Sequence, residues 1–156
     1  NVDEKGLVKG NQYIDACLKK YGKNNVIVIC AEIENQIMEL EPKDRKYFMT
    51  ESGIKETGLD LLIKTGYKIL KLITFFTTTP KETRAWTISK QCKAIKAAGL
   101  IHSDFEKGFI KAETISYDDF VFCKGNNEAK NTGKLRLEGK DYIVKDGEIL
   151  YFRFST

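Results

Sequence analysis

Residues 72–77 read Leu-Ile-Thr-Phe-Phe-Thr, and at this stretch the hydrophobic period of the sequence changes. Before Leu72 apolar residues recur mainly at helical spacing, whereas after it they alternate with a period of two. Thr78-Thr79-Pro80 is a turn signal, and residues 83–88 have the pattern of a returning strand. The change of period predicts that a sheet begins at residue 72.

The pattern of short strands continues to the end of the chain. Residues 110–115 alternate cleanly and predict a third strand, and residues 142–144 and 149–154 flank an Asp-Gly pair that is a strong hairpin signal. Short helices are predicted between the strands, at residues 103–107, 118–123 and 127–131. A small mixed sheet crossed by short helices predicts an α+β roll of a size that can fold alone.

The first part of the chain has a different pattern. Residues 26–31 read Val-Ile-Val-Ile-Cys-Ala, a continuous apolar run typical of a strand covered on both faces in a parallel α/β sheet. Helices are predicted around it, at residues 11–21, 34–40, 43–50 and 58–71. Because one strand cannot form a sheet alone, residues 1–71 are expected to be an incomplete α/β domain. The chain starts with Asn, which also suggests a piece of a longer protein.

The composition excludes several classes of protein. Hydrophobic residues make up 42% and charged residues 31%, as in an ordinary globular protein, and the longest apolar runs are far shorter than the roughly 20 residues of a membrane span. The cysteines have no C-x-x-C spacing, so neither a zinc site nor a disulfide framework is expected, and no metal ligands are predicted. We expect a cytoplasmic protein without a membrane partner. The net charge of +4 permits contact with a polyanion without requiring it.

Longer motifs resemble a known family. Residues 83–88 (Thr-Arg-Ala-Trp-Thr-Ile), 97–110 and 138–147 resemble the TGS domain of the Obg-like ATPases, the YchF family. Residues 1–4 (Asn-Val-Asp-Glu) and 30–34 (Cys-Ala-Glu-Ile-Glu) resemble the late base-recognition motifs of the P-loop domain of that family. The resemblance runs the whole length of the chain, with local departures at Thr79, Gln91-Cys92 and Ile95-Lys96.

The resemblance implies a two-part organisation. Residues 72–156 would be a TGS domain with the β-grasp (ubiquitin-like) fold. Residues 1–71 would be the carboxy-terminal remnant of an OBG-type P-loop nucleotide-binding domain, a truncated α/β segment whose larger part lies upstream. The parent would bind and hydrolyse ATP with Mg²⁺, and no cofactor is expected on this chain by itself.

The base-recognition motif differs by one side chain from that of guanine-binding relatives. Those relatives carry Asn-x-x-Asp, whose carboxylate accepts hydrogen bonds from guanine, whereas the fourth position here is Glu4, one methylene longer. Hydrogen bonding alone does not predict adenine; the family, in which this variant accompanies ATP preference, implies it. The predicted base contacts are Asn1, Val2, Glu4 and the backbone of Ala31. A GTP-specific parent remains an alternative.

No catalytic residue is predicted in this chain. The sequence has no G-x-x-x-x-G-K-[ST] motif to hold phosphates and Mg²⁺, and phosphoryl transfer depends on that positioning. His102 and Asp104 form the one His-x-Asp pair, but no serine or cysteine nucleophile is arranged with them. A structural or binding-surface role is therefore favoured for His102.

A basic stripe is the candidate partner surface. Lys90, Lys93 and Lys96 step at intervals of three, and Lys107 and Lys111 could extend the stripe. Trp86 and Phe109 could lie nearby as stacking surfaces for bases. The other interpretation is that the lysines are solvated charges and both aromatic residues are core. Because TGS domains are linked with RNA and translation, the resemblance implies contact with a ribosomal subunit or RNA; no DNA partner is expected.

A second function class stays open. The chain could be a stand-alone RNA- or protein-binding TGS module with no nucleotide involvement. An upstream P-loop in the parent gene would separate the two hypotheses.

Overall fold

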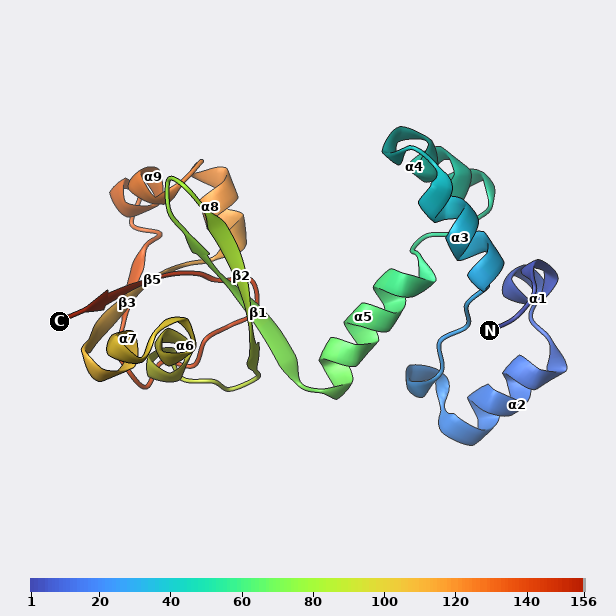
Figure 1. The fold of residues 1–156 in the computed structure, drawn as a ribbon, viewed down its shortest axis with the longest axis horizontal. Coiled ribbons are helices and arrows are strands. Elements are labelled where there is room, and N and C mark those ends of the chain that lie inside the picture. The colour runs from blue at the N-terminus through green and yellow to red at the C-terminus, as the bar shows by residue number, and fades with distance from the viewer. Residues whose placement is uncertain (156) are drawn as a thin grey trace. The chain divides into compact units, whose positions relative to one another are not determined.

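The computed structural model describes residues 1–155, which divide into two compact units, residues 1–66 and the residues from Tyr67 onward (Figure 1). We refer to them as unit 1 and unit 2. Helix α5 (Gly58–Ile69) runs across the division. Within residues 1–155 no helix is both long enough and apolar enough to cross a membrane.

Unit 1 is made of helices and connecting segments. They are α1 (Glu4–Lys9), α2 (Gln12–Tyr21), the 3-10 turn η1 (Lys23–Asn25), α3 (Ala31–Glu39), α4 (Pro42–Glu51) and the start of α5. Local sequence explains where they begin. Asp3 and Asn11 accept hydrogen bonds from first-turn amides as N-caps, and Pro42 occupies the first turn of α4, where its missing N–H costs nothing.

The strand expected at residues 26–31 is not formed, and that prediction is wrong. Val26 and Cys30 have extended backbone angles, but residues 26–30 pair with no strand in the described part of the chain, and Ala31 already begins α3. Within unit 1 their neighbours are helices and loops, which offer no extended edge for a ladder. The apolar residues of this segment are only half-buried, except for Cys30.

Unit 1 has a small core. Cys30, Ile33 and Ile37 are its buried residues, and partly buried side chains from α1, α4 and the following loop pack against them. Many of its large apolar side chains are exposed instead: Val8, Tyr13, Tyr21, Met38, Tyr47, Leu59, Leu61, Leu62 and Ile63.

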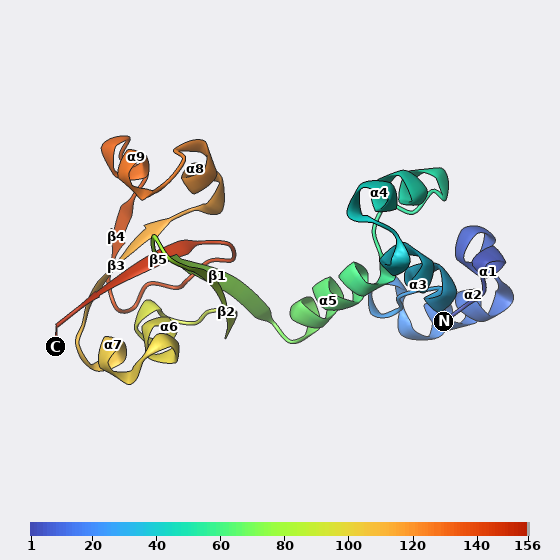
Figure 2. The ribbon, with the colours of Figure 1, turned by 45° about the horizontal axis from the view of Figure 1, so that its top comes forward.

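Unit 2 is a five-stranded sheet with helices on both faces. Its elements are β1 (Leu72–Thr78), β2 (Thr83–Ser89), α6 (Ala94–Ile101), α7 (Ser103–Lys107), β3 (Phe109–Ile115), α8 (Tyr117–Phe122), α9 (Asn126–Asn131), β4 (Arg136–Glu138) and β5 (Ile149–Phe154). The strand order is β2-β1-β5-β3-β4, with β1 and β5 parallel and the other neighbours antiparallel (Figure 2). The expected α+β class is confirmed.

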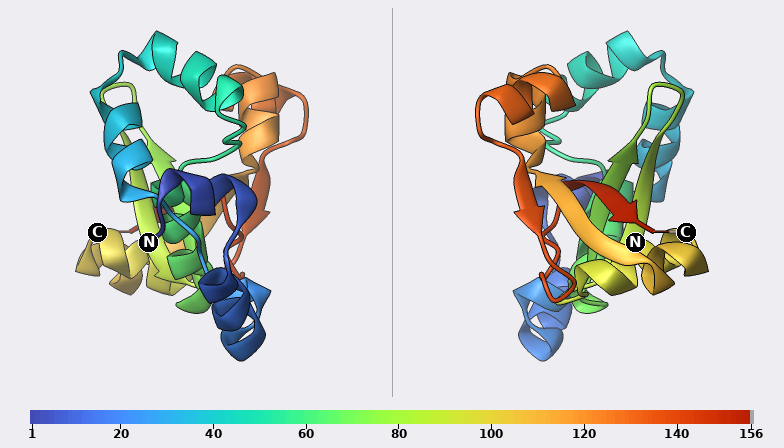
Figure 3. Two further views of the ribbon diagram at one scale, coloured as in Figure 1. Left: turned by 90° about the vertical axis from the view of Figure 1, so that its right-hand side faces the viewer. Right: turned by 90° about the vertical axis from the view of Figure 1, so that its left-hand side faces the viewer.

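The alternation of each strand divides its side chains between two clusters. Phe75, Ala112 and Leu150 point into the main core, to which α6 contributes Ala94 and Ala97. Cys123, at the end of α8, and Ala129, in α9, pack with Ile115 in a second cluster on the opposite face. Figure 3 (right) shows the orange α8 and α9 and the yellow α6 and α7 on opposite sides of this unit.

The hairpin expected at residues 142–154 is a second error. Strand β5 pairs with β1 and β3, whereas Ile143 makes only an isolated bridge with Lys93. The Asp-Gly turn docks on β1: Asp146 Oδ1 accepts from the Thr74 N–H at 2.8 Å, and the Gly147 N–H donates to the Thr74 carbonyl at 2.8 Å. The Asp-Gly pair therefore does form a turn, but the turn hydrogen-bonds to β1 and does not connect two paired strands of a hairpin. Helix α6 and strand β4 were not predicted.

Candidate functional site

The two predicted base-recognition motifs lie side by side in unit 1. Asn1 Oδ1 accepts a hydrogen bond from the Ala31 N–H at 3.0 Å, and the Val2 N–H donates to the Ile29 carbonyl at 2.8 Å. The first N–H groups of a helix have no intrahelical partner, and Cys30, the residue before α3, provides no side-chain cap. Asn1 supplies that cap from a position 30 residues away in the sequence.

The next residues fix the position of Glu4. Asp3 Oδ1 accepts from the Gly6 N–H at 2.8 Å, which starts α1 with Glu4 as its first residue. Gly6 is buried, and a Cβ there would lie 2.8 Å from Asp3 Oδ1 and 3.2 Å from Val2 Cβ. Glycine therefore lets the turn close, and the exposed Glu4 side chain projects from a defined helix start.

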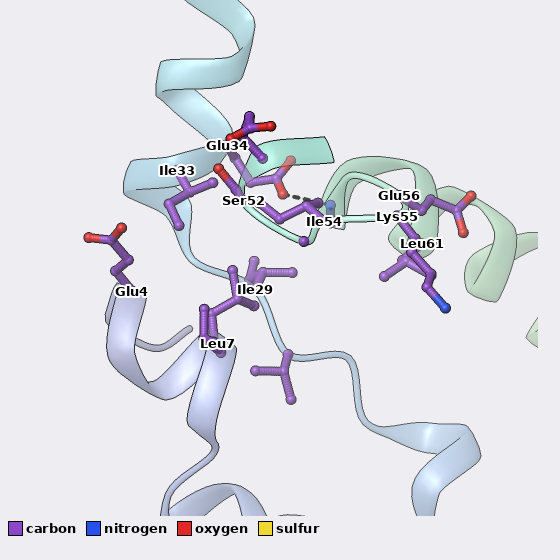
Figure 4. Close-up of a pocket in the computed structure, with 15 residues that line it drawn as sticks. Glu4, Leu7, Ile29, Ile33, Glu34, Ser52, Ile54, Lys55, Glu56 and Leu61 are labelled. Carbon is purple, nitrogen blue, oxygen red and sulfur yellow. Dashed lines mark hydrogen bonds between the residues drawn. The ribbon is translucent and has the colours of Figure 1, made fainter. Parts of the chain in front are cut away.

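A cavity of about 730 Å³ opens beside α1. Its lining is apolar from Leu7, Val8, Val28, Ile29, Ile33, Ile54 and Leu61, and polar or charged from Glu4, Glu34, Glu51, Ser52, Lys55 and Glu56, with Gly53 and Gly58. Figure 4 shows Glu4 at the margin, apart from the group formed by Glu34, Ser52 and Ile54. Of the predicted base contacts only Glu4 lines this cavity.

The charge of the cavity disfavours phosphate groups. Four glutamates line it against one lysine, Lys55. Two of these glutamates already have partners. Glu34 accepts from the Gly58 N–H at 2.6 Å and so caps α5, and Glu56 accepts a hydrogen bond from Lys64 that raises the pKa of Lys64. The cavity suits an uncharged, partly apolar group better than a polyphosphate.

The groups left for a base edge are few. Asn1 Oδ1 is occupied by Ala31, so its Nδ2 group is the donor that remains, and the exposed Glu4 carboxylate is an acceptor. Both adenine and guanine present a donor and an acceptor on the Watson–Crick edge of the base, so these two protein groups do not distinguish the bases. No group of three or more potential metal ligands occurs within residues 1–155. In unit 1 these two groups, one donor and one acceptor, are the ones available to a base edge, and the cavity beside them is lined by four glutamates and one lysine.

The predicted basic stripe is partly neutralised. Lys93 Nζ lies 2.8 Å from Asp141 Oδ1, and Lys96 Nζ lies 2.5 Å from Glu106 Oε1. The hydrogen bond to Glu106 raises the pKa of Lys96. Lys90, in the turn after β2, has no ion-pair partner among residues 1–155.

The rest of the stripe does not gather on the same face. Lys107 ends α7, but Lys111 lies on the face of the sheet opposite to α6, because its neighbour Ala112 is buried in the main core. Trp86 and Phe109 pack against that core, and Trp86 Nε1 donates to Thr77 Oγ1 at 2.9 Å. Both aromatic residues therefore serve the core, as the alternative interpretation expected.

His102 has a local structural role. It is the N-cap residue of α7, and its Nδ1 accepts from the Asp104 N–H at 3.2 Å.

A buried polar cluster in unit 2 was not predicted from the sequence. Glu148 is only 3% exposed, and its Oε1 lies 2.5 Å from Arg136 Nη2 and 2.6 Å from the Tyr142 hydroxyl. Burial, and then the hydrogen bond to Glu148, raise the pKa of Tyr142 to about 12. Nothing in the pattern distinguishes this glutamate from the exposed ones, since it directly follows a turn.

Comparison with known proteins gives consistent results. The family model YchF-GTPase_C, described as "Protein of unknown function (DUF933)", matches residues 72–155. The "Ribosome-binding ATPase YchF" of Haemophilus influenzae is 48% identical over 158 residues, and that of Bacillus subtilis is 49% identical over 157 residues. These matches cover 100% and 99% of this chain but 43% of each relative, so the chain spans less than half of their length.

A solved structure is also similar. The YchF GTPase of Schizosaccharomyces pombe superimposes with a TM-score of 0.87 at 29% identity, covering 98% of this chain and 42% of that one.

Proposed function

Because the chain belongs to the YchF family, we propose that it is the base-reading and partner-binding part of a nucleotide-dependent switch protein. The two bacterial relatives are named ribosome-binding ATPases, and the yeast structure is named a GTPase. The parent of this chain binds and hydrolyses ATP, or GTP, and contacts the ribosome. The observation that carries the proposal is the hydrogen bond between Asn1 and Ala31, which joins the two base-recognition motifs.

Residues 1–71 are the closing segment of an OBG-type P-loop domain. Two features support this assignment. Residues 26–30 pair with no strand in the described chain, and Val26 and Cys30 at their two ends have extended backbone angles, as in a strand that lacks its neighbours; the large apolar residues of α5 are exposed. A protein does not normally leave so much apolar surface uncovered. The missing strands of a doubly wound sheet would cover it.

Within the parent, the proposal divides the nucleotide between this chain and an upstream segment. Asn1, Val2, Glu4 and the Ala31 backbone contact the base, and the upstream segment holds the phosphates. Mg²⁺ bound there would neutralise charge on the phosphates. This chain alone is not catalytic, because it contains no G-x-x-x-x-G-K-[ST] motif.

Residues 72–156 are a TGS domain with the β-grasp fold. The strand order β2-β1-β5-β3-β4, with a central parallel pair and α6 packed across one face, supports this assignment. The TGS domain contacts the ribosome or RNA, and this partner implies a cytoplasmic location. Two of the five candidate lysines remain for this contact, Lys90 and Lys107. Lys93 and Lys96 already have ion-pair partners, and Lys111 lies on the sheet face opposite to α6.

The base site is tested in a protein that also carries the upstream P-loop segment. Asn1→Ala removes the cap of α3 and is expected to weaken ATP and GTP binding alike, whereas Glu4→Asp is expected to raise GTP affinity relative to ATP. Competition of the two nucleotides for a fluorescent ATP analogue measures both changes. An unchanged ATP/GTP ratio in Glu4→Asp would remove Glu4 from base reading. A coding region without a P-loop upstream of Asn1 would favour a stand-alone RNA- or protein-binding module.

The partner surface needs a matched control. Lys90→Glu, Lys93→Glu and Lys96→Glu together are expected to weaken binding to ribosomal subunits at low salt, because each reversed charge turns an attraction to phosphate into a repulsion. Lys19→Glu, Lys20→Glu and Lys43→Glu change the net charge equally but lie in unit 1. Equal binding by both triple variants would contradict a specific basic surface on unit 2.

A further inference from the structure

The outer edge of β2 is a row of backbone groups without ladder partners. In the antiparallel β1–β2 pair the Thr79 N–H donates to the Glu82 carbonyl and the Lys90 N–H donates to the Lys71 carbonyl. Hydrogen-bonded pairs alternate along such a ladder, so the even-numbered residues of β2 face β1. Thr83, Ala85, Thr87 and Ser89 therefore direct their N–H and C=O groups away from the sheet. β2 is the end strand of the sheet order.

This edge is open and sterically accessible. Thr83, Ala85, Thr87 and Ser89 are all exposed, and their side chains are small. Among these four residues only Ser89 uses an outward backbone group within the described part of the chain, since its carbonyl accepts from the Cys92 N–H at 3.1 Å; the Thr87 side-chain hydroxyl lies 2.9 Å from the Tyr67 hydroxyl. An extended chain could therefore approach along most of the seven residues of β2.

The opposite edge of the sheet, strand β4, is protected against pairing with another strand. β4 has only three residues, and its Arg136 and Glu138 side chains form an ion pair at 3.2 Å. Short strands and charged side chains are the usual means by which proteins block edge pairing. β2 is longer and contains no proline and no lysine. Its single charge, Arg84, has its guanidinium over the Trp86 ring, 4.4 Å from the centroid.

The charges around the edge select the partner. Lys81, Arg84 and Lys90 lie in or beside β2 and have no ion-pair partner among residues 1–155, whereas Glu82 is the only acidic residue from Thr79 to Lys93. Two copies of this edge would bring like charges together, which disfavours self-pairing. RNA has no backbone donors and acceptors at strand spacing. An extended polypeptide with acidic side chains satisfies both the ladder and the charge.

We propose that the free edge of β2 binds an extended acidic segment of a partner protein, which adds a sixth strand to the sheet by β-augmentation. Backbone hydrogen bonds at Thr83, Ala85 and Thr87 hold the segment, and Lys81, Arg84 and Lys90 select its acidic side chains. This site is separate from the base contacts but shares Lys90 with the proposed ribosome contact, so the charge variant for this site changes Lys81 and Arg84 instead.

The test uses the whole 156-residue chain and a synthetic peptide. The probe is as long as β2, alternates Glu and Val, and has blocked ends; the control peptide alternates Lys and Val. We expect the Glu-Val peptide to bind and to slow hydrogen exchange at the Ala85 and Thr87 amides, which face the peptide, in two-dimensional NMR spectra. The Lys-Val peptide is expected to bind at least about tenfold more weakly.

Two variants separate the edge from the fold. Ala85→Pro removes an outward N–H without removing a bond to β1 and is expected to weaken binding about tenfold, whereas Ala85→Val keeps the N–H and binds as the unchanged chain does. If Ala85→Pro fails to fold, Lys81→Glu with Arg84→Glu is expected to weaken binding of the Glu-Val peptide about tenfold, which tests the charge selection, while protection of the Ala85 and Thr87 amides tests the edge. Binding without protection of Ala85 and Thr87, equal binding of both peptides, or dimerisation of the chain through β2 would overturn the proposal.

Discussion

Unit 1 and unit 2 differ in how completely they bury their apolar residues. Unit 2 has a continuous core with eight buried residues and a sheet in which β1, β3 and β5 are paired on both sides. Unit 1 has three buried residues in its core, and its extended segment at residues 26–30 has no ladder partner in the described chain. Similar apolar content therefore gives a larger core in unit 2 and a smaller one in unit 1.

The difference between the units shows that a β-branched hydrophobic run does not form a strand by itself. Val26 to Ile29 are as β-branched as any strand of unit 2, yet they remain half-buried, because strand pairing needs a second chain segment. The energetic consequence is that stability should be concentrated in unit 2. Variants at matched positions in the two units test this contrast.

The largest effect is expected in the main core. Phe75 is fully buried, with Trp86 and Phe152 rings at centroid distances of 6.4 and 6.1 Å. Phe75→Ala should lower the free energy of unfolding of unit 2 by about 3–5 kcal/mol, because it removes apolar packing and leaves a cavity. The only tryptophan of the chain, Trp86, reports this transition by fluorescence during urea unfolding.

The matched variant in unit 1 is Ile33→Ala, at a residue 6% exposed. It is expected to cost about 2 kcal/mol or less, since a small core can collapse around the gap, and to leave the Trp86 transition unchanged. Circular dichroism at a helix-sensitive wavelength would follow unit 1. An equal shift of the Trp86 transition in both variants would show that the two units unfold as one.

A smaller effect is expected from two glutamates, one in each unit. Glu148→Gln weakens the buried hydrogen bond to Arg136 and should cost about 1–3 kcal/mol, because the acceptor loses its charge although Arg136 keeps its ion pair with Glu138. Glu34→Gln, at the cap of α5, should cost less than about 1 kcal/mol, because its amide oxygen still accepts from the Gly58 N–H. Urea midpoints of the two variants measure the difference, and the reverse order would contradict the contrast.

The smallest effect is a pH dependence in unit 2. The hydrogen bond from Arg153 lowers the pKa of Glu113 below its ordinary value. The folded state therefore holds a proton on Glu113 less readily than the unfolded state, so this contribution is complete above the ordinary pKa and is lost as the pH falls through the lowered one. Because Arg153 is exposed, the contribution should stay below about 1 kcal/mol.

Glu113→Gln tests this dependence. The variant should unfold in acid with a shallower dependence of unit 2 stability on pH and should differ least from the unchanged chain at the lowest pH. A parallel acid dependence in both proteins would assign it to other carboxylates.

Unit 2 was predicted from the sequence better than unit 1 for a physical reason. The alternation at residues 72–77, 83–88 and 110–115 is set by local pleating, and the strands β1, β2 and β3 confirm it. The pairing of β5 depends on where the Asp146-Gly147 turn docks, and periodicity carries no information on that contact. Helix α6 buries one face through Ala94, Ala97 and Ala98, but its exposed face carries the apolar Leu100, which hides the helical period.

The candidate sites show the same limit. Sequence motifs brought Asn1 and Ala31 together correctly, because a long motif encodes a tertiary contact. Spacing alone failed for the lysine stripe, since intervals of three place residues together only within one helix and Lys111 lies on a strand. The role of Asn1, Ala31 and the lysines in binding stays a prediction.

Hydrogen exchange of the intact 156-residue chain tests the central contrast most directly. Strand β5 (Ile149–Phe154) pairs with β3 along its length and with β1 at Ile149, so its hydrogen-bonded amides should exchange only on global unfolding of unit 2. The amides of residues 26–30, which lack ladder partners in the described chain, should exchange orders of magnitude faster under the same conditions. Protection of residues 26–30 equal to that of β5 would contradict the contrast, because it would show that unit 1 is complete without further strands.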